Sequence, residues 1–357
     1  MFVGGEFYAD ERWTLDQPGV DTCGLTFLNG GKACLIVIAD ALRAQGIGRV
    51  LLPAYLCPDI VTTLERCGLA CAYYDIRPDL SIDLADLERK AAPKQAVYFI
   101  NYFGFPHSRE TQEILKDLQR RGSLLIEDNA QTGFWEHSLG DFVFNSLRKC
   151  CAHDGGYLAT HADVSAFIQR QRNAPNRRLP VIRAYRARLA DYLFGNTDSY
   201  DELVRLYELS EQYYAEDMAV AGDRQEKEAI ERLDWAGMWQ ARRENYAYLL
   251  EAIRGIPGLT PIFPGLPEDA TPLGLPVYVN GMARDELWER LGEAGIGLTI
   301  HWQGIPNDAR LNGNATAVGI AKRMLTLACD QRTSRTQMDT MVNCIRRILG
   351  EAKTGQS

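Results

Sequence analysis

The sequence contains no long hydrophobic run. Its longest uninterrupted apolar stretch is ACLIVIA, residues 33–39, which ends at Asp40. A membrane-spanning helix needs roughly 20 apolar residues, so we expect no membrane span. The opening segment MFVGGEFYAD carries acids and no basic leader, which argues against a signal peptide. These absences predict a protein of the cytoplasm.

Basic residues and metal-binding patterns are also scarce. The chain has 39 Lys and Arg against 47 Asp and Glu, a net charge of -8. This balance disfavours a general nucleic-acid binder, which needs a basic surface. The five histidines show no spacing typical of a metal helix, and none of the nine cysteines lies in a CxxC pair. We therefore expect no metal site, and reduced, buried thiols instead of a disulfide framework.

Motifs of several enzyme classes are missing or incomplete. No GxSxG elbow of the hydrolases is present. FLNGGKA has Thr26 and Ala33 where a Walker phosphate loop needs a glycine and a serine or threonine. GIGRVL, residues 46–51, lacks the third glycine of a dinucleotide fingerprint and precedes a strand instead of following one. The sequence gives no support to a hydrolase or a dinucleotide-binding enzyme.

From about residue 28 the sequence alternates short apolar runs with helical patterns. We expect strands at 49–56, 69–76, 96–103, 123–130, 141–146 and 155–160, and helices at 32–45, 58–67, 83–91 and 109–121. Continuous apolar strands separated by helices indicate an α/β domain whose mostly parallel sheet is covered on both faces. In such sheets ligands bind at the carboxyl ends of the strands.

The rest of the chain has a different pattern. Residues 162–250 are largely helical in character, and a run of prolines between 257 and 267 then breaks the chain. Beyond it we expect a strand at 272–280, a helix at 284–295, a strand at 296–302 and a helix at 335–349. The 357 residues therefore divide into an N-terminal arm (1–27), a large α/β domain (28–235) and a smaller α+β domain (236–357).

Polar side chains follow several of the expected strands. In SLLIEDNA, residues 123–130, Asp128 ends a buried strand, where a carboxylate is costly to desolvate unless a positive group lies against it. Ser146 and Lys149 leave a later strand, and the segment 29–31 (NGG) opens a helix whose N–H groups could hold a phosphate. A buried lysine, a buried aspartate and a phosphate cradle together indicate pyridoxal 5'-phosphate (PLP).

Simpler interpretations of the same residues remain open. Asp128 could cap the helix that follows it, because aspartate is a common N-cap residue. Lys149 could be an exposed loop lysine, and the segment 29–31 could be a plain turn into a helix. The spacing of Asp128 and Lys149 after neighbouring strands favours the cofactor site over these alternatives.

The order of several segments also resembles the DegT/DnrJ/EryC1/StrS family, the fold-type-I, PLP-dependent sugar aminotransferases. The resemblance runs through FLNGGKACL, NYFGFP, LIEDNAQ and GDFVFNSLRKCCAHDGGYL, and resumes at RRENYAYLLEAI and LTLACDQR. It implies a large domain with a mostly parallel sheet of the seven-stranded type and a smaller α+β C-terminal domain. It also implies an active site at a homodimer interface.

The resemblance implies roles for individual residues. Lys149 would be the Schiff-base lysine, Asp128 the partner of the pyridine nitrogen, and Gln131 a contact of the phenolic oxygen of the ring. The other cofactor-binding candidates are Gly30, Gly31, Lys32, Cys57 and Ser146. The chain departs from the family at Cys57, where an aromatic ring often covers the cofactor, and at Gly30, which replaces a common serine.

The function that this resemblance implies is transfer of an amino group from glutamate or glutamine to a nucleotide-linked keto-sugar, in amino-sugar biosynthesis. Some relatives replace the lysine by histidine and dehydrate sugars, so Lys149 favours transamination. PLP-dependent dehydration or other carbanion chemistry, and a non-catalytic ligand-sensing protein, are the alternatives. Tyr102, His301 and Trp302 could line a sugar pocket, although such side chains also pack in cores.

One further feature is a run of seven arginines without an acid in residues 165–190. Its simplest interpretation is a solvated helix face. The alternative is a surface that binds a phosphate-rich substrate, for which arginine is well suited.

Overall fold

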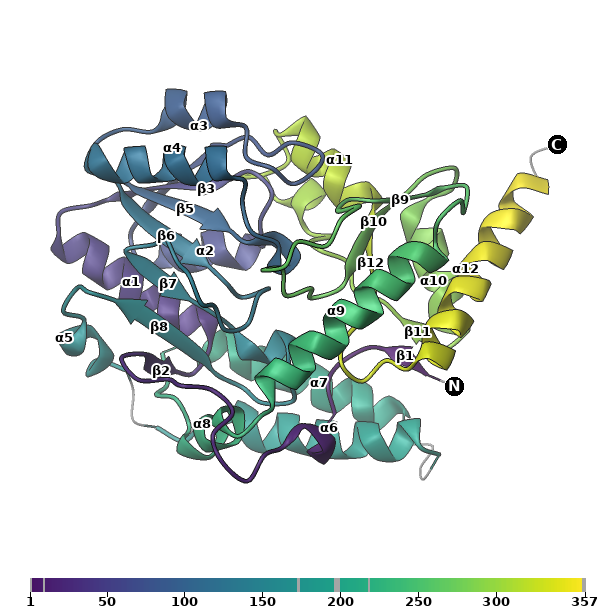
Figure 1. Cartoon of the computed structure of the whole chain (residues 1–357). Coiled ribbons are helices and arrows are strands. Elements are labelled where there is room, and N and C mark those ends of the chain that lie inside the picture. Colours follow the sequence, from purple (N-terminus) through teal and green to yellow (C-terminus); the bar gives the residue numbers. More distant parts are fainter. Residues whose placement is uncertain (1, 9, 172–173, 196–199, 218, 355–357) are drawn as a thin grey trace.

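The computed structural model describes residues 2–8, 10–171, 174–195, 200–217 and 219–354 (Figure 1). Its larger part is built on a seven-stranded sheet in the order β2-β8-β7-β6-β5-β3-β4. The strands are β2 (Thr26–Leu28), β3 (Arg49–Pro53), β4 (Ala70–Tyr74), β5 (Ala96–Ile100), β6 (Leu124–Asp128), β7 (Phe142–Phe144) and β8 (Gly156–Thr160). The five strands from β3 to β7 run parallel to one another. β8 is antiparallel to both of its neighbours, β2 and β7. The predicted mostly parallel α/β sheet is confirmed.

Helices cover both faces of this sheet. α1 (Gly31–Ala44) and α2 (Pro58–Arg66) pack together on one face, and α3 (Leu84–Lys90) and α4 (Arg109–Arg120) on the other (Figure 1). Because both faces are covered, a central strand such as β5 is buried at all of its positions. The strands and helices predicted between residues 32 and 160 are present within a few residues of their expected ends, and β2 is an additional strand.

Side-chain caps explain where several helices begin. Asp83 caps α3, Ser108 caps α4 and Asn314 caps α11 (Ala315–Arg323), each accepting a hydrogen bond from a backbone N–H of the first turn. Helix α1 differs, because its N-cap residue Gly30 has no side chain and a φ of 148°, a conformation that favours glycine. The first N–H groups of α1 therefore lack a side-chain acceptor from their own cap.

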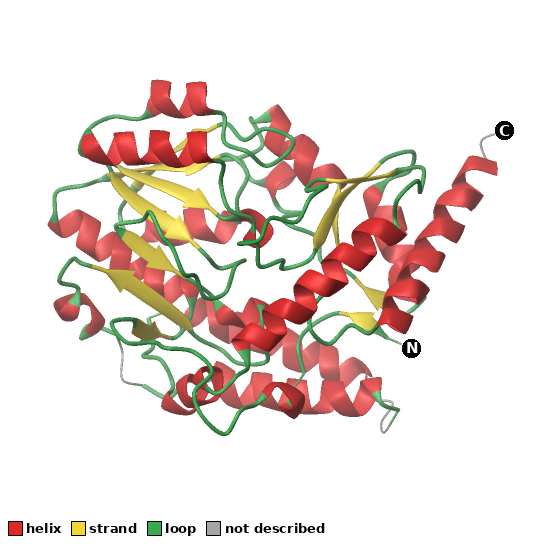
Figure 2. Ribbon diagram, viewed as in Figure 1, coloured by secondary structure: helices red, strands yellow, loops and turns green. Residues whose placement is uncertain are grey.

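The smaller part contains an antiparallel sheet of β9 (Leu259–Pro261), β10 (Leu275–Val279) and β12 (Met324–Leu327). Its helices are α10 (Arg284–Glu293), α11 and α12 (Arg335–Thr354), and α9 (Trp235–Ala252) extends toward it from the large sheet (Figure 2). β1 (Val3–Gly4) pairs with β11 (Ile296–Gly297), so the N-terminal arm reaches this part. The predicted boundaries at 27/28 and 235/236 stay a prediction.

One strand prediction in this part is largely wrong. Of the expected strand at 296–302, only Ile296–Gly297 forms β11, and Thr299 makes an isolated bridge to Thr326. The strand stops because residues 301–304 form a turn. The pattern also misses β9, β12 and α11, which are short or lie in segments without clear periodicity.

The arginine-rich segment forms much of α6 (Arg178–Leu193), which packs against α7 (Tyr200–Glu216). The expectation of a solvated face is wrong for Arg178 and Arg186, which are 1% and 3% exposed. Both contact the buried Asp154, Arg178 through Nε at 2.5 Å and Arg186 through Nη2 at 2.9 Å. Burial raises the pKa of Asp154, but the two guanidinium groups outweigh it and lower the pKa to about 2.

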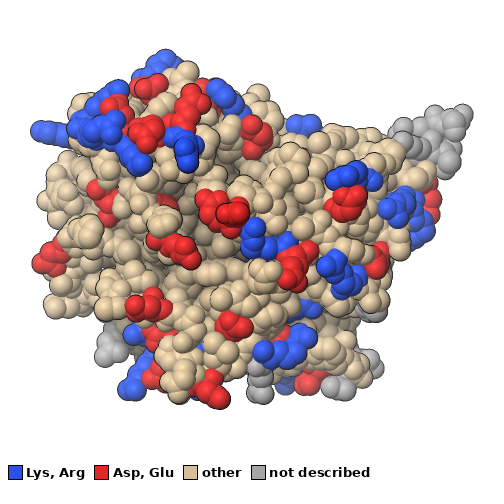
Figure 3. Space-filling view, in the orientation of Figure 1, with Lys and Arg blue, Asp and Glu red and all other residues tan. Residues whose placement is uncertain are grey.

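The remaining helices and the surface complete the fold. α5 (Ser165–Ile168) and α8 (Arg224–Glu231) are short, as are the 3-10 turns η1 (Glu11–Trp13), η2 (Tyr102–Gly104) and η4 (Ile305–Asn307). Figure 3 shows positive and negative side chains interspersed on the face in view, with a dense mixed cluster over α3 and α4. No helix in the described ranges is long and apolar enough to cross a membrane.

The buried ion pairs predict the effect of Asp154→Asn. Since the carboxyl pKa falls from 3.8 to about 2 in the fold, we expect the substitution to lower the free energy of unfolding by about 2 kcal/mol at pH 7. A lowered carboxyl pKa stabilises the fold only while the group is ionised, so the loss should shrink as the pH falls from about 4 to about 2. Chemical denaturation across this range measures it, with exposed Asp16→Asn as control. An effect that does not depend on pH would contradict the ion-pair origin.

Candidate functional site

Asp128 is the last residue of β6 and is only 4% exposed. Its Oδ2 accepts a hydrogen bond from Tyr98 Oη at 2.5 Å, and its Oδ1 accepts one from the backbone N–H of Ala130 at 2.8 Å. Burial raises the pKa of this carboxyl, and the ammonium group of Lys149 opposes the shift. The strand end thus holds a buried carboxyl group whose ionised form a further positive partner would stabilise.

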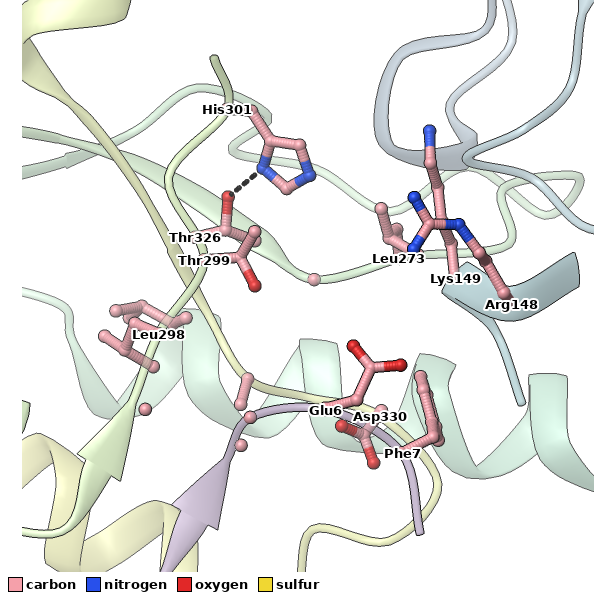
Figure 4. Close-up of a pocket in the computed structure, with 16 residues that line it drawn as sticks. Glu6, Phe7, Arg148, Lys149, Leu273, Leu298, Thr299, His301, Thr326 and Asp330 are labelled. Atoms are coloured by element: carbon pink, nitrogen blue, oxygen red, sulfur yellow. Dashed lines mark hydrogen bonds between the residues drawn. The ribbon is translucent and has the colours of Figure 1, made fainter. Parts of the chain in front are cut away.

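Lys149 ends the 3-10 turn η3 (Leu147–Lys149) that follows β7. It lines a cavity of about 220 Å³ together with His301 and Thr326, which lie on the opposite wall (Figure 4). Within the described part of the chain, Lys149 Nζ has no hydrogen-bond or ion-pair partner. Its charge acts on Asp128 and His301, so these groups lie near one another. The amine is free to react with a molecule in the cavity.

Gln131 follows Asp128 by three residues and is 2% exposed. Its Oε1 accepts a hydrogen bond from the backbone N–H of Phe103 at 2.8 Å, which fixes the side chain. Its Nε2 is buried without a hydrogen-bond partner in the structure. A buried donor without a partner is unfavourable, so this amide fits an acceptor on a bound molecule.

The uncapped end of α1 lies against Ser146. A Cβ atom added to Gly31 would come within 3.1 Å of Ser146 Cβ, and one added to Gly30 within 3.3 Å of the hydroxyl of Tyr214. A side chain at either position would crowd these groups, so the two glycines leave room beside the helix N-terminus. Free N–H groups, a helix dipole and a buried serine hydroxyl together suit an anion such as phosphate.

The two remaining cofactor candidates lie beside this cradle. Lys32 forms an ion pair with Asp59 at 2.8 Å and lies 4.8 Å from the ring centre of Tyr214. Cys57 is the N-cap residue of α2, and burial raises the pKa of its thiol while Lys149 and Lys32 lower it. The thiol therefore lies close to both lysines. This chain has a cysteine at the position where an aromatic residue is common in the resembling family.

The three predicted sugar-pocket residues lie close together, with the Trp302 ring centre 6.3 Å from that of Tyr102 and 5.8 Å from that of His301, but their surroundings differ. His301 lines the cavity, its Nδ1 is 3.1 Å from Thr326 Oγ1, and burial lowers its pKa to about 3, so the ring is neutral. Tyr102 is fully enclosed and donates its hydroxyl proton to the backbone oxygen of Tyr55, as a core residue does. Trp302 is half-buried against the Tyr55 ring, with 5.0 Å between ring centres. Of these three residues, His301 alone lines the cavity.

The sequence interpretation missed three residues that the fold brings to the site: Tyr98, Arg148 and Tyr214. The only local signal for Tyr98 is its position two residues before the end of β5, the strand next to β6. Arg148 adjoins Lys149 and could have been considered with it. Tyr214 comes from α7, far along the chain, and no local pattern points to it. Within the described residues no cluster of His, Cys, Asp or Glu could hold a metal ion.

Known structures share this fold. CalS13, a sugar aminotransferase of Micromonospora echinospora, superposes with a TM-score of 0.62 at 19% identity, over 90% of this chain and 87% of its own. DesV of S. venezuelae, solved with a ketimine intermediate, gives 0.62 at 19% identity, over 91% and 84%. A DegT DnrJ EryC1 StrS aminotransferase of Brucella abortus gives 0.60 at 17%, over 91% and 86%. The chain has the sugar-aminotransferase fold.

This likeness confirms the fold class that the resemblance implies, the fold-type-I α/β architecture with a smaller second sheet. No protein-family model matches the sequence, and no curated protein matches it. The sugar-aminotransferase fold is therefore retained here at low sequence identity, with the candidate residues at the carboxyl edge of the large sheet.

The environment of Asp128 predicts that this site destabilises the cofactor-free protein. A carboxyl whose pKa is raised by burial is harmless while neutral and unfavourable once ionised, so the destabilisation appears as the pH rises above the folded-state pKa. We expect Asp128→Asn to raise the thermal midpoint near neutral pH by about 1–3 °C, the shift that roughly 1 kcal/mol gives in a protein of this size. The gain should vanish at acid pH. Thermal scans of cofactor-free protein test this, and a lower midpoint for the variant at pH 7 would refute it.

Proposed function

We propose that the protein is a PLP-dependent aminotransferase that transfers an amino group from an amino acid to a keto-sugar. The observation that carries this proposal is the grouping of a buried carboxylate at Asp128, a free amine at Lys149 and an unpartnered amide at Gln131. These three groups lie at the carboxyl edge of one sheet, next to an uncapped helix N-terminus.

Each group would have a distinct role. Bound PLP supplies an electron-withdrawing ring that stabilises negative charge on the carbon next to the reacting nitrogen. Asp128 would accept a hydrogen bond from the protonated ring nitrogen, whose positive charge would offset the desolvation of the carboxylate. Gln131 Nε2 would donate to the phenolic oxygen. The first N–H groups of α1 and Ser146 would hold the phosphate.

Lys149 would do two things in sequence. Its Nζ would first hold the cofactor covalently. Once an amino-acid donor had displaced it, the free Nζ would accept the proton from the α-carbon of the donor and return it on the other side of the reacting nitrogen. The neighbouring His301 has a pKa lowered to about 3, so its imidazole would stay neutral and could form hydrogen bonds with a bound molecule.

The finer assignments are part of the same proposal. The acceptor would be a nucleotide-linked keto-sugar, the donor glutamate or glutamine, and the working form a cytoplasmic homodimer. The similarity to CalS13, a sugar aminotransferase, and the resemblance of the motifs support the sugar class. A lysine at position 149 favours amino transfer over dehydration.

Addition of PLP to the purified protein tests the proposal. We expect a visible absorption band that glutamate bleaches, and borohydride reduction of the loaded protein should fix the label on the peptide that contains Lys149. Lys149→Ala should abolish the covalent label and lower the transfer rate at least about a thousandfold. Exposed Lys116→Ala is the matched control and should behave like the unmodified chain.

Two results would reject this reading. A label on another side chain would remove Lys149 from its role. A protein that stays colourless with PLP would favour a ligand-sensing module on this fold.

A further inference from the structure

Arg148 lies beside Lys149 on the wall of the same cavity (Figure 4). Its Nη1 donates to Glu211 at 3.2 Å. Its Nε is buried without a hydrogen-bond partner, and Nη2 makes no hydrogen bond to any side chain or backbone group in the described ranges. One edge of the guanidinium group, the one formed by Nε and Nη2, is thus left without an acceptor.

The guanidinium group is held in place from the other side. Its carbon lies 4.4 Å from the ring centre of Tyr214 in α7, a distance typical of a cation–π contact. Glu211 Oε1 is shared with Arg178, whose Nη1 lies 2.8 Å away. Two guanidinium groups therefore share a single carboxylate oxygen, so Glu211 compensates the charge of Arg148 only in part.

Two other acids line the cavity, Asp330 and Glu6. Asp330 pairs with Arg332 at 3.0 Å, and Glu6 lies 3.7 Å from Arg186. Glu6 Oε1 is buried without a hydrogen-bond partner, but within the described residues neither acid makes a hydrogen bond to the Nε–Nη2 edge of Arg148. A planar guanidinium edge with two parallel N–H groups is the geometry that binds a carboxylate in a bidentate manner.

We propose that the Nε–Nη2 edge of Arg148 binds the α-carboxylate of the amino donor. This inference rests on the proposed function, because it places the carboxylate beside the amine that reacts. In an α-amino acid the nitrogen and the carboxylate are separated by one carbon. The protein groups that meet them must therefore line the same cavity, as Lys149 and Arg148 do. The cavity of about 220 Å³ has the size of a small molecule of this class.

Two variants separate charge from geometry. Arg148→Met removes the charge and keeps an apolar chain of similar length, and Arg148→Lys keeps the charge and loses the fork. Calorimetry measures the binding of glutarate, a dicarboxylate that cannot react, to the protein with and without PLP. We expect glutarate affinity to fall about 10- to 100-fold for Arg148→Met, with only a small recovery in Arg148→Lys. Exposed Arg346→Met is the matched control.

The rate at which amines bleach the cofactor band gives a second measurement. With glutamate, the concentration for half-maximal rate should rise by about the same factor in Arg148→Met. With benzylamine, which has no carboxylate, the variant should match the parent within about twofold. Equal losses with both amines would indicate a structural role and overturn the inference.

The remaining outcomes distinguish the two proposals. If Arg148→Met weakens PLP affinity and leaves glutarate binding unchanged, the open edge binds the cofactor phosphate, and only this inference fails. If the parent protein takes up no PLP, the proposed function fails. Glutarate binding that still depends on Arg148 would then support the oxyanion site by itself, and binding independent of Arg148 would reject it.

Discussion

The buried carboxylate of Asp128 is the constraint on which the site depends. It is almost enclosed at the end of a parallel strand, and burial raises its pKa although the charge of Lys149 opposes the shift, so its ionised form is costly in the empty protein. Its two hydrogen bonds, from Tyr98 and from the backbone of Ala130, orient the oxygens but bring no charge. Because Lys149 offsets the cost of burial only in part, a cationic heterocycle beside this carboxylate would stabilise its ionised form further, and that gain would contribute to the free energy of binding.

The turn that carries Lys149 is held by contacts from distant elements. Leu147 N–H donates to the oxygen of Gly155 at 2.9 Å, and the buried Asp154 next to this glycine is held by Arg178 and Arg186 of α6. From the other side, Arg242 Nη2 of α9 donates to the Cys150 oxygen at 3.1 Å. The arginine-rich segment thus acts within the molecule, because it positions the loop that carries Lys149.

The sequence is sufficient for the parts of this structure that repeat locally. Continuous apolar strands and intervening helices predict the central sheet, and the residues that end those strands predict the Asp128 and Lys149 pair. Tyr98, Arg148 and Tyr214 escape prediction because their roles exist only after strand pairing and helix packing join separate segments. Arg178 illustrates the same limit. A charged helix residue is expected to face solvent unless its buried partner is known, and this partner, Asp154, lies 24 positions earlier in the chain. The strand expected at 296–302 is wrong for a different reason: the local apolar pattern continues into residues 301–304, which form a turn.

Two opposite requirements meet at this sheet edge. Asp128 favours a cation, while the first turn of α1 and the open edge of Arg148 favour anions. A phosphorylated pyridinium satisfies the first two, because it carries both charges on one rigid ring. The third is left for a second molecule, and a zwitterionic amino acid brings a carboxylate at one bond from the carbon that bears its reacting nitrogen. The amine of Lys149 lines the same cavity as Arg148 and its charge acts on Asp128, so it links the site that favours a cation with the edge that favours the donor's carboxylate.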